Sequence, residues 1–243
     1  MVLGIEARQE RTRVGNQAAA MTLVQSCDIF ALQLHTLLNP TFGTKTMRQR
    51  FSSTTSREFE AWSELRLKDR IRPDLRVLFV GINPGVRSAI TGHHFAGYSN
   101  RFWKLLSESG LTPEPITYEH DDRLPEWGLG ITNLIARPTP GIDDLDSSEY
   151  INGWKILDRK IRRYRPEVVA LVGVTLFRAI LPLLDAVLPR GNSKNVIGPQ
   201  PQTIHGARIF VLPNPSGRNA NYSYGEMLKA FVSLRQSLCV SGR

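Results

Sequence analysis

Short apolar runs alternate with helical periodicity from about residue 59 onward. Runs rich in Val, Ile and Leu, each bounded by Gly, Pro or charged residues, predict four buried strands at 76–82, 130–135, 167–173 and 208–212. Apolar residues recur at helical spacing over 100–109, 149–164, 175–184 and 224–238. Because nearly continuous apolar strands alternate with helices, we expect an α/β fold. Its three layers, α/β/α, would enclose a central, mostly parallel four-stranded sheet.

The first 57 residues lack this regularity. They are rich in Ser, Thr, Arg and Gln, with one short amphipathic piece at 29–38, and they lack the basic and apolar regions of a secretory signal. We expect a flexible or poorly structured extension at 1–57 and a single α/β domain at 58–240. Two alternatives exist for the first segment: it is an organelle-targeting extension, or translation starts later, at Met21 or Met47.

Charge and cysteine content limit the kinds of partner and the cellular compartment that we expect. The net charge is +9, from 31 basic and 22 acidic side chains, which suits a polyanionic partner and equally a basic protein that binds no nucleic acid. Cys27 and Cys239 are far apart in the sequence, so a disulfide framework or zinc knuckle is not expected and a reducing compartment is. No apolar run approaches the ~18 residues of a membrane span. We expect an intracellular protein: cytoplasm or nucleoid in a bacterium, nucleus or mitochondrion in a eukaryote.

Polar residues gather directly after the first and last predicted strands. Gly81-Ile82-Asn83-Pro84-Gly85 forms a sharp loop, because Pro84 lacks an N–H and the glycines tolerate close approach, and it presents Asn83. The last strand runs into a second polar loop at 212–219. Since parallel strands end at one edge of the sheet, both loops should meet at one pocket. A nucleotide-binding Rossmann enzyme is disfavoured, because no glycine-rich phosphate motif follows the first strand.

Four ordered motifs carry a resemblance to a known family. They are Gly81-Ile82-Asn83-Pro84-Gly85, Gly92-His93-His94-Phe95 with Asn100-Arg101-Phe102-Trp103-Lys104, Gly130-Ile131-Thr132-Asn133-Leu134 with Arg137-Pro138-Thr139, and Pro213-Asn214-Pro215-Ser216-Gly217. Over about 75–236 the chain resembles the mismatch-specific uracil-DNA glycosylase and thymine-DNA glycosylase family of the uracil-DNA glycosylase superfamily. The resemblance implies the same α/β/α fold.

The resemblance implies a monofunctional DNA glycosylase that starts base-excision repair. It would flip uracil mispaired with guanine out of the helix and excise it by water attack at the anomeric carbon, with thymine and ethenocytosine as further candidate bases. Asn83 would be the catalytic residue: an amide cannot act as a base, so it would position the water. Backbone N–H groups around Ile82, Asn83 and Phe95 would stabilise the leaving base anion. Neither motif loop contains a lysine for a Schiff base, so strand cleavage is not expected.

The resemblance also assigns a base pocket. Phe95 would stack on the flipped base, and Ser88 and His94 would limit the space at the 5-position of the pyrimidine. Taken alone, Phe95 could be a core aromatic, Asn133 a satisfied buried amide, and His93-His94 solvated loop histidines. A metal pair at His93-His94 lacks further ligands at a useful spacing. The pocket residues implied are Gly81, Ile82, Ser88, His94, Phe95, Asn133 and Asn214.

The loop after the last strand would contact DNA around the flipped base. Arg218 lies where the family inserts a wedge, while Ser216, Gly217 and Asn219 would contact the wedge site and the opposite guanine. Asn214 stands where many uracil glycosylases have histidine, which favours the mismatch-specific branch, although Arg218-Asn219 also fits the single-strand-selective branch. Alone, this loop is typical of a plain turn. Phosphate contacts are expected at Arg101 and Lys104, with Arg137 as another candidate.

The expected partners follow from this assignment. They are double-stranded DNA with G·U or related mismatches and, downstream, the enzymes that process abasic sites. We expect a monomer with no cofactor, no metal and no membrane contact. The alternatives are a single-strand-selective or broad uracil-DNA glycosylase, or a catalytically weak module that binds damaged DNA.

Overall fold

The computed structural model describes residues 61–184 and 196–239. The chain divides into two units, Met1–Leu65 and Arg66–Arg243, and everything below concerns the second. The predicted extension at 1–57, with its amphipathic piece at 29–38, lies outside the described residues. No helix in the described residues combines the length and apolar character that a membrane crossing requires.

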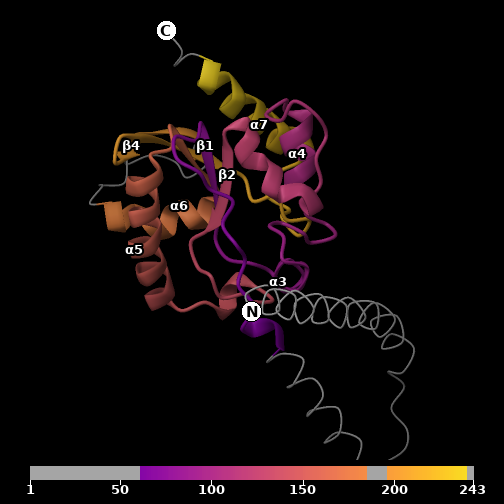
Figure 1. Cartoon of the computed structure of the whole chain (residues 1–243), viewed down its shortest axis with the longest axis vertical. Coiled ribbons are helices and arrows are strands. Elements are labelled where there is room, and N and C mark those ends of the chain that lie inside the picture. The colour runs from indigo at the N-terminus through magenta and orange to yellow at the C-terminus, as the bar shows by residue number, and fades with distance from the viewer. Residues whose placement is uncertain (1–60, 185–195, 240–243) are drawn as a thin grey trace, which may run out of the picture. The chain divides into compact units, whose positions relative to one another are not determined.

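The centre of the fold is a twisted five-stranded sheet in the order β2-β1-β3-β5-β4 (Figure 1). Four strands run parallel, and β4 pairs antiparallel with β5 at one edge. This confirms the mostly parallel sheet of an α/β fold, but the predicted number of four strands is wrong. The strands are β1 (Val77–Gly81), β2 (Leu129–Asn133), β3 (Val168–Val172), β4 (Gly198–Ile204) and β5 (Ala207–Leu212).

The missed strand, β4, carries the sequence GPQPQTI. Prolines cannot donate to a β-ladder and are confined to sheet edges, which is where Pro199 and Pro201 lie. The register shifts between Pro199 and Thr203, so the pairing is irregular there. Such a strand has no apolar run to reveal it in the sequence.

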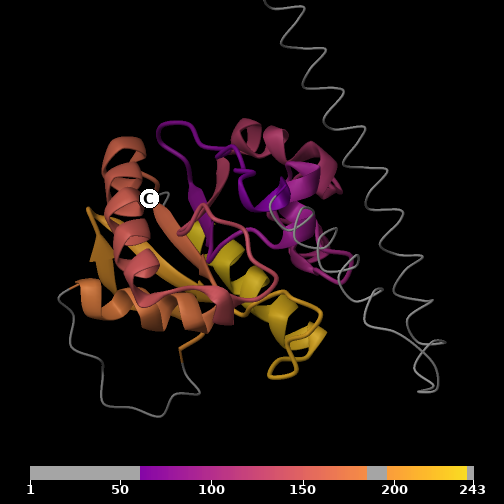
Figure 2. The same ribbon diagram turned by 90° about the horizontal axis from the view of Figure 1, so that it is seen from below.

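Helices cover both faces of the sheet (Figure 2). The predicted helices at 100–109, 149–164 and 224–238 are confirmed within a few residues, whereas 175–184 is an α-helix continued by a 3-10 turn. The short helix after Pro84 and the turns at 118–127 and 142–144 were not predicted. The elements are α3 (Val86–Thr91), α4 (Phe102–Glu108), η1 (Tyr118–Trp127), η2 (Ile142–Asp144), α5 (Ser147–Tyr164), α6 (Val174–Ile180), η3 (Leu181–Leu184) and α7 (Tyr224–Cys239).

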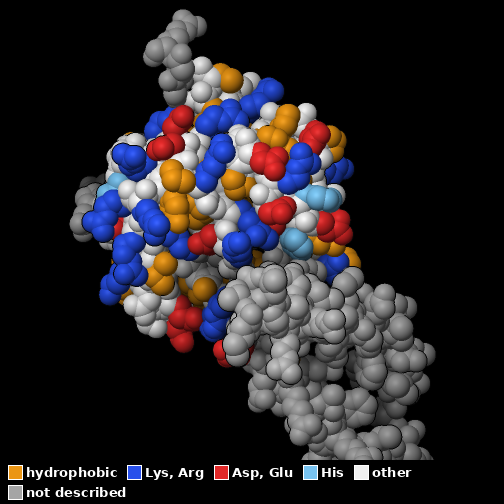
Figure 3. Space-filling model, viewed as in Figure 1, with side chains coloured by type: hydrophobic (Ala, Val, Ile, Leu, Met, Phe, Trp, Pro, Cys, Tyr) orange, Lys and Arg blue, Asp and Glu red, His pale blue; other side chains and the backbone are white. Residues whose placement is uncertain are grey.

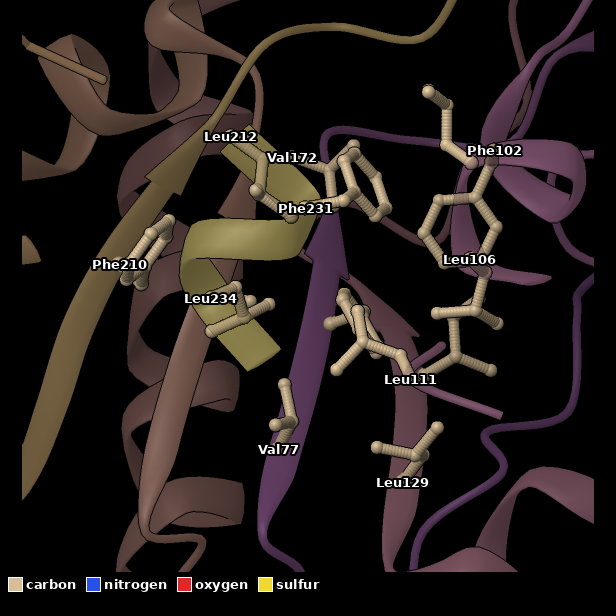
Figure 4. Close-up of a cluster of buried hydrophobic side chains, with 14 of the residues drawn as sticks. Val77, Phe102, Leu106, Leu111, Leu129, Val172, Phe210, Leu212, Phe231 and Leu234 are labelled. Carbon is tan, nitrogen blue, oxygen red and sulfur yellow. The ribbon is translucent and has the colours of Figure 1, made fainter. Parts of the chain in front are cut away.

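Strand residues alternate between two hydrophobic cores. In β1, Val77 and Phe79 pack with the buried faces of α4 and α7, as Figure 4 shows for part of this cluster. Leu78 and Val80 pack on the other side with α5 and α6. Burial on both faces explains why β1 reads as a continuous apolar run and not as an alternating one.

The β2 edge of the sheet is covered by the chain that leads into β1. Arg70 and Ile131 exchange backbone hydrogen bonds, 3.0 Å from Arg70 N to Ile131 O and 2.9 Å in return. The same segment is tied to α5, because Lys160 Nζ lies 2.6 Å from Asp69 Oδ2 and 3.0 Å from Thr132 Oγ1. This segment therefore has a fixed place beside the carboxyl end of β2.

Candidate active site

A pocket of about 600 Å³ opens where the parallel strands end. Its walls come from the loop after β1, from α3, from the chain around Phe95, from the ends of β2 and β3, and from the loop after β5. The two polar loops expected to converge thus share one pocket. Of the residues predicted for the site, those lining it are Ile82, Asn83, Ser88, Phe95, Asn133, Asn214, Ser216 and Arg218.

The loop after β1 is held in place by backbone pairing that continues beyond the sheet. Leu134 N donates to Gly81 O at 2.8 Å, and Ile135 N donates to Ile82 O at 2.8 Å. Thr139 N then donates to Pro84 O at 3.1 Å. The turn that presents Asn83 therefore rests on a second, parallel segment along its length.

The Asn83 amide has a defined orientation. Its Nδ2 donates to Arg137 O at 3.1 Å and to Thr139 Oγ1 at 2.7 Å. The carbonyl can only accept, and the Thr139 hydroxyl has its own proton directed at Gly141 O, 2.5 Å away, so both contacts require the amide nitrogen. The side-chain oxygen Oδ1 of Asn83 is left as the acceptor that this residue offers to the pocket.

Phe95 forms an aromatic wall. One face of its ring stacks on Phe102, with centroids 4.3 Å apart and planes at 19°, and the residue borders the pocket. Its backbone has φ 52°, an unusual conformation for a bulky residue. Gly81 makes room for it, because a Cβ there would lie 3.2 Å from Phe95 Cζ. Gly81 therefore acts beneath the pocket instead of lining it.

His94 supports Asn133 from behind the pocket. It is 1% exposed, so the expectation of a solvated loop histidine is wrong for this residue. Its Nε2 lies 3.2 Å from Lys68 O, which only accepts, so the ring proton is on Nε2 and Nδ1 accepts from Asn133 Nδ2 at 3.4 Å. Burial lowers the pKa of His94, with the Asp121 carboxylate opposing, and favours the neutral ring. This arrangement fixes the direction of the Asn133 amide.

Asp121 is a buried carboxylate that connects several segments near the pocket, and the sequence pattern did not single it out. Its carboxylate is fully buried and accepts from Arg70 Nε at 2.9 Å and from His94 N at 3.0 Å, and it lies 3.2 Å from His93 Nδ1. These bonds tie three segments around the backbone that carries Phe95. Within 61–184 and 196–239, no group of three His, Cys, Asp or Glu side chains is placed to hold a metal ion.

Ser88 also acts on the backbone beside Phe95. It is 6% exposed, and its Oγ accepts from Ala96 N at 3.0 Å. Since His94 N and Ala96 N are both engaged, only the N–H of Phe95 among these three consecutive amides remains available to a ligand.

The loop after β5 closes the other side of the pocket. Arg218 Nη2 donates to Pro140 O at 3.3 Å, so this side chain reaches from the loop after β5 to the segment around Pro140, which also lines the pocket. Gly217 packs so closely on Ser99 that a Cβ would lie 2.4 Å from the serine Cβ. Asn219 Nδ2 donates to Asn214 O at 2.8 Å, which keeps Asn219 within the loop and outside the pocket wall.

A family model described as the Uracil DNA glycosylase superfamily matches residues 69–238, most of the chain. The chain belongs to the uracil DNA glycosylase superfamily. Within the described residues, the matched segment includes the five strands and the residues that line the pocket, apart from Leu67. Membership supports a DNA glycosylase, a hydrolase that acts on uracil in DNA, and it agrees with the observed fold.

The predicted phosphate contacts of this glycosylase lie outside the pocket. Arg101 Nη1 lies 4.0 Å from Met227 Sδ, and Lys104 lies 3.7 Å from Glu108 Oε1 and 5.1 Å from the ring of Tyr224. Arg137 is committed to structure, since it holds Glu149 through two bonds of 2.8 and 2.7 Å. Arg101 and Lys104 stay predictions, and Arg137 is better described as an ion-pair residue.

Charge on the glycosylase surface is uneven. Figure 3 shows Lys and Arg side chains gathered on the side of the molecule where α5 lies. The exposed members on this helix are Lys155, Arg159, Arg162 and Arg163. The pocket itself is lined by two arginines, Arg87 and Arg218, and by one carboxylate within the described residues, Asp143. Most of its wall is polar but uncharged, or apolar.

Proposed function

We propose that this protein is a mismatch-specific uracil-DNA glycosylase that removes uracil opposite guanine. The observation that carries the proposal is the Asn83 amide, whose nitrogen is held by Arg137 O and Thr139 Oγ1 and whose oxygen is left for the pocket. Thymine and ethenocytosine opposite guanine are further candidate substrates. Both polar loops and Phe95 stand around the same space, as a flipped base would require.

In this mechanism Asn83 Oδ1 accepts a hydrogen bond from a water and holds it beside the anomeric carbon. The glycosidic bond breaks with its electron pair on the base, the water oxygen bonds to the anomeric carbon, and the water proton passes to solvent. The amide contributes by placement and takes no proton. N–H groups of Ile82 and Asn83, with that of Phe95, stabilise the charge that develops on the base.

Base recognition falls to Phe95 and Asn133. The uncovered face of Phe95 would stack on the pyrimidine, while the amide of Asn133, oriented by neutral His94, would bond its polar edge. Ser88, whose Oγ accepts from Ala96 N, and His94, whose carbonyl accepts from Trp103 Nε1, would set the room at the 5-position. That room decides whether thymine is accepted.

Mismatch selectivity is assigned to the loop after β5. Arg218, already across from Pro140, would fill the space left by the flipped base, and Ser216, Gly217 and Asn219 would face the opposite guanine. An asparagine at 214 supports this branch over uracil glycosylases that use histidine there. The abasic product would pass to enzymes that process such sites, in the cytoplasm or nucleoid of a bacterium or the nucleus or mitochondrion of a eukaryote.

The deciding experiment measures base release from G·U, G·T, A·U, ethenocytosine·G and single-stranded uracil substrates under single-turnover conditions. We expect release from G·U and ethenocytosine·G duplexes, and Asn83→Ala should lower the rate by about 10²- to 10³-fold. Asp143→Asn, which changes the carboxylate lining the same pocket, is the matched control and should stay within about twofold of the wild-type rate.

Three results would count against the proposal. Equal activity on single-stranded uracil would place the protein in another branch. An unchanged rate in Asn83→Ala would remove the water-positioning role. Wild-type protein that binds the G·U duplex without releasing uracil would be a damage-binding module.

A further inference from the structure

The solvent-exposed face of α5 carries a continuous row of cations. Helical residues that lie four, seven and eight positions apart share one face of the helix. This spacing relates Lys155, Arg159, Arg162 and Arg163, and all four side chains are exposed. They belong to the gathering of Lys and Arg that Figure 3 shows on the side where Figure 1 draws α5. We refer to these four residues as the α5 basic face.

The carboxylates of α5 are engaged with other groups. Glu149 Oε2 lies 2.7 Å from Arg137 Nη2, and Asp158 Oδ1 lies 2.7 Å from Nε2 of His205 in the β4–β5 turn. Within 61–184 and 196–239, no ion pair joins a carboxylate to the α5 basic face. The described part of the protein therefore leaves these four charges available to a ligand.

Helix stability explains only half of this row. Positive charge in the last turn of a helix is favoured by the helix dipole, and this accounts for Arg162 and Arg163. The effect falls off beyond the last turn, whereas Lys155 and Arg159 lie further from the end of α5. Their alignment with the two last-turn arginines points to a common partner.

The α5 basic face lies away from the base pocket. α5 begins beside the pocket, because Glu149 pairs with Arg137, whose carbonyl holds Asn83. It ends near the start of β1, where Tyr164 O accepts from Asp74 N at 2.8 Å. The pocket opens at the opposite ends of the strands, and the residues that line it include none from α5 among those described. A ligand of this face is thus separate from the base that enters the pocket.

The chemistry of the face fits a phosphate backbone. Three of its four cations are arginines, whose planar guanidinium pairs with phosphate oxygens through two hydrogen bonds. From Lys155 to Arg163 the helix rises about 12 Å, a length over which one DNA strand carries about four phosphates. Ile151 and Ile156, the exposed apolar side chains of α5, stand singly and do not form the apolar centre of a protein interface. Duplex DNA is therefore favoured over an acidic protein.

We propose that the α5 basic face binds the phosphate backbone of a second DNA duplex while the base pocket engages the first. Occupancy of the pocket by DNA rests on the proposed function, but binding at α5 requires no base chemistry. The protein would hold two DNA segments at once, which lets it pass from one segment to the other without release into solution.

Energy transfer between two labelled duplexes tests the proposal. The full-length protein is mixed with an equal amount of a donor-labelled G·U duplex, whose uridine is the non-cleavable 2′-fluoro analogue, and of an acceptor-labelled undamaged duplex. We expect energy transfer, because one protein holds both duplexes. Binding of the undamaged duplex should weaken with salt, with a log–log slope of magnitude about 3 to 4 for four phosphate contacts. A single chain should lose the energy transfer when it carries Lys155→Gln, Arg159→Gln, Arg162→Gln and Arg163→Gln.

A matched control lies on α7. Lys229→Gln with Arg235→Gln removes the same charges as Lys155→Gln with Arg159→Gln, and all four residues are exposed on helices. The α7 pair should keep the energy transfer, whereas the α5 pair should lose most of it. Uracil release from an ordinary G·U duplex and thermal melts are measured with every variant, and both should resemble the wild type because none of these residues lines the pocket.

The outcomes separate the two proposals. Uracil release without energy transfer, or energy transfer that is equal in the α5 and α7 variants, overturns the α5 proposal alone; the first result is the one expected if the face binds an acidic protein. Energy transfer that needs the α5 basic face, in a wild-type protein that releases no uracil, supports the α5 proposal and overturns the proposed glycosylase function. Absence of both overturns both.

Discussion

At the residue scale, the chemistry depends on the direction in which one amide points. An asparagine is useful as a water holder only if its oxygen faces the water, and rotation by 180° would present a donor instead. Thr139 and the Arg137 carbonyl together prevent that rotation at Asn83. Thr139 lies 56 residues away in the sequence, so the polar loop alone could not identify it as a partner.

Thr139→Val should therefore slow uracil release without preventing base binding. Loss of the hydroxyl removes one of two acceptors for Asn83 Nδ2 and leaves the amide poorly placed, so we expect a fall of about tenfold or more in the single-turnover rate at saturating enzyme. Thr139→Ser keeps the hydroxyl and should restore most of the rate. Equal rates for the valine and serine variants would contradict the orienting role.

Gly81 tests the packing beneath the pocket. A Cβ there would lie 2.5 Å from Asn133 Oδ1 and 3.2 Å from Phe95 Cζ, so Gly81→Ala should displace two base-contacting groups and reduce uracil release more than tenfold. Gly85→Ala is the control in the same loop, because nothing lies within 4 Å of its Cβ position. Similar rates for both variants, with intact folding by circular dichroism, would show that the contact at Gly81 is unimportant.

At the element scale, apolar runs predicted the parallel strands because those strands are buried on both faces. β4 escaped prediction because an edge strand with two prolines needs neither an apolar run nor strict alternation. The helix α3 escaped because its six residues carry no capping side chain and too few turns for a period to show. The sequence therefore predicts the elements that are buried on both faces. Edge strands and helices of one or two turns are harder to predict, because they depend on contacts that form only in the folded chain.

The first turn of α5 is linked to the pocket through Arg137. Glu149 accepts from Asp146 N at 3.0 Å at the first turn of the helix and pairs with Arg137, whose carbonyl holds Asn83. Its bonds with Arg137 lower the pKa of Glu149 to about 2, from an ordinary 4.5. A carboxylate with a depressed pKa stabilises the fold above its ordinary pKa, and this contribution fades as the pH falls from about 4.5 to 2.

Arg137→Met should consequently lower the free energy of unfolding at pH 7 by about 1–2 kcal/mol, a value reduced by solvent screening because the arginine side chain is 37% exposed. The gap between variant and wild type should narrow as the pH falls from about 4.5 to 2, because Glu149 becomes half protonated in the wild type only near its own pKa of about 2. Urea denaturation at pH 7, 4 and 2.5 measures it, with the exposed Arg159→Met of the same helix as control. A gap that is constant with pH would mean that Arg137 acts only by packing.

At the scale of the whole molecule, the sequence predicted that the site lies where the parallel strands end. It did not predict the buried residues that hold the site in place. Motif order placed Asn83, Phe95 and Asn214 together because parallel strands end on one side. Asp121, buried in the 3-10 segment η1, stands in a stretch with no recognisable pattern, and its partners come from residues 70, 93 and 94. Contacts of this kind arise only once the chain has folded.

The glycosylase unit should act without the first 57 residues. Among the described residues, those that line the pocket all come from position 67 onward, so we expect a chain that starts at residue 58 to release uracil from G·U within about twofold of the full-length rate. Single-turnover assays and thermal melts of both chains test this. A tenfold loss of rate with an unchanged melting temperature would assign the first segment a role in DNA binding.

The two edge strands of the sheet, β2 and β4, bear on whether copies of this protein associate with one another. At the β2 margin, Arg70 has already taken the backbone groups of Ile131 that another strand would seek. At the β4 margin, Pro199 and Pro201 lack the N–H needed to extend the ladder. A sheet terminated on both sides is a poor template for aggregation, so the protein should remain a monomer by light scattering as its concentration rises.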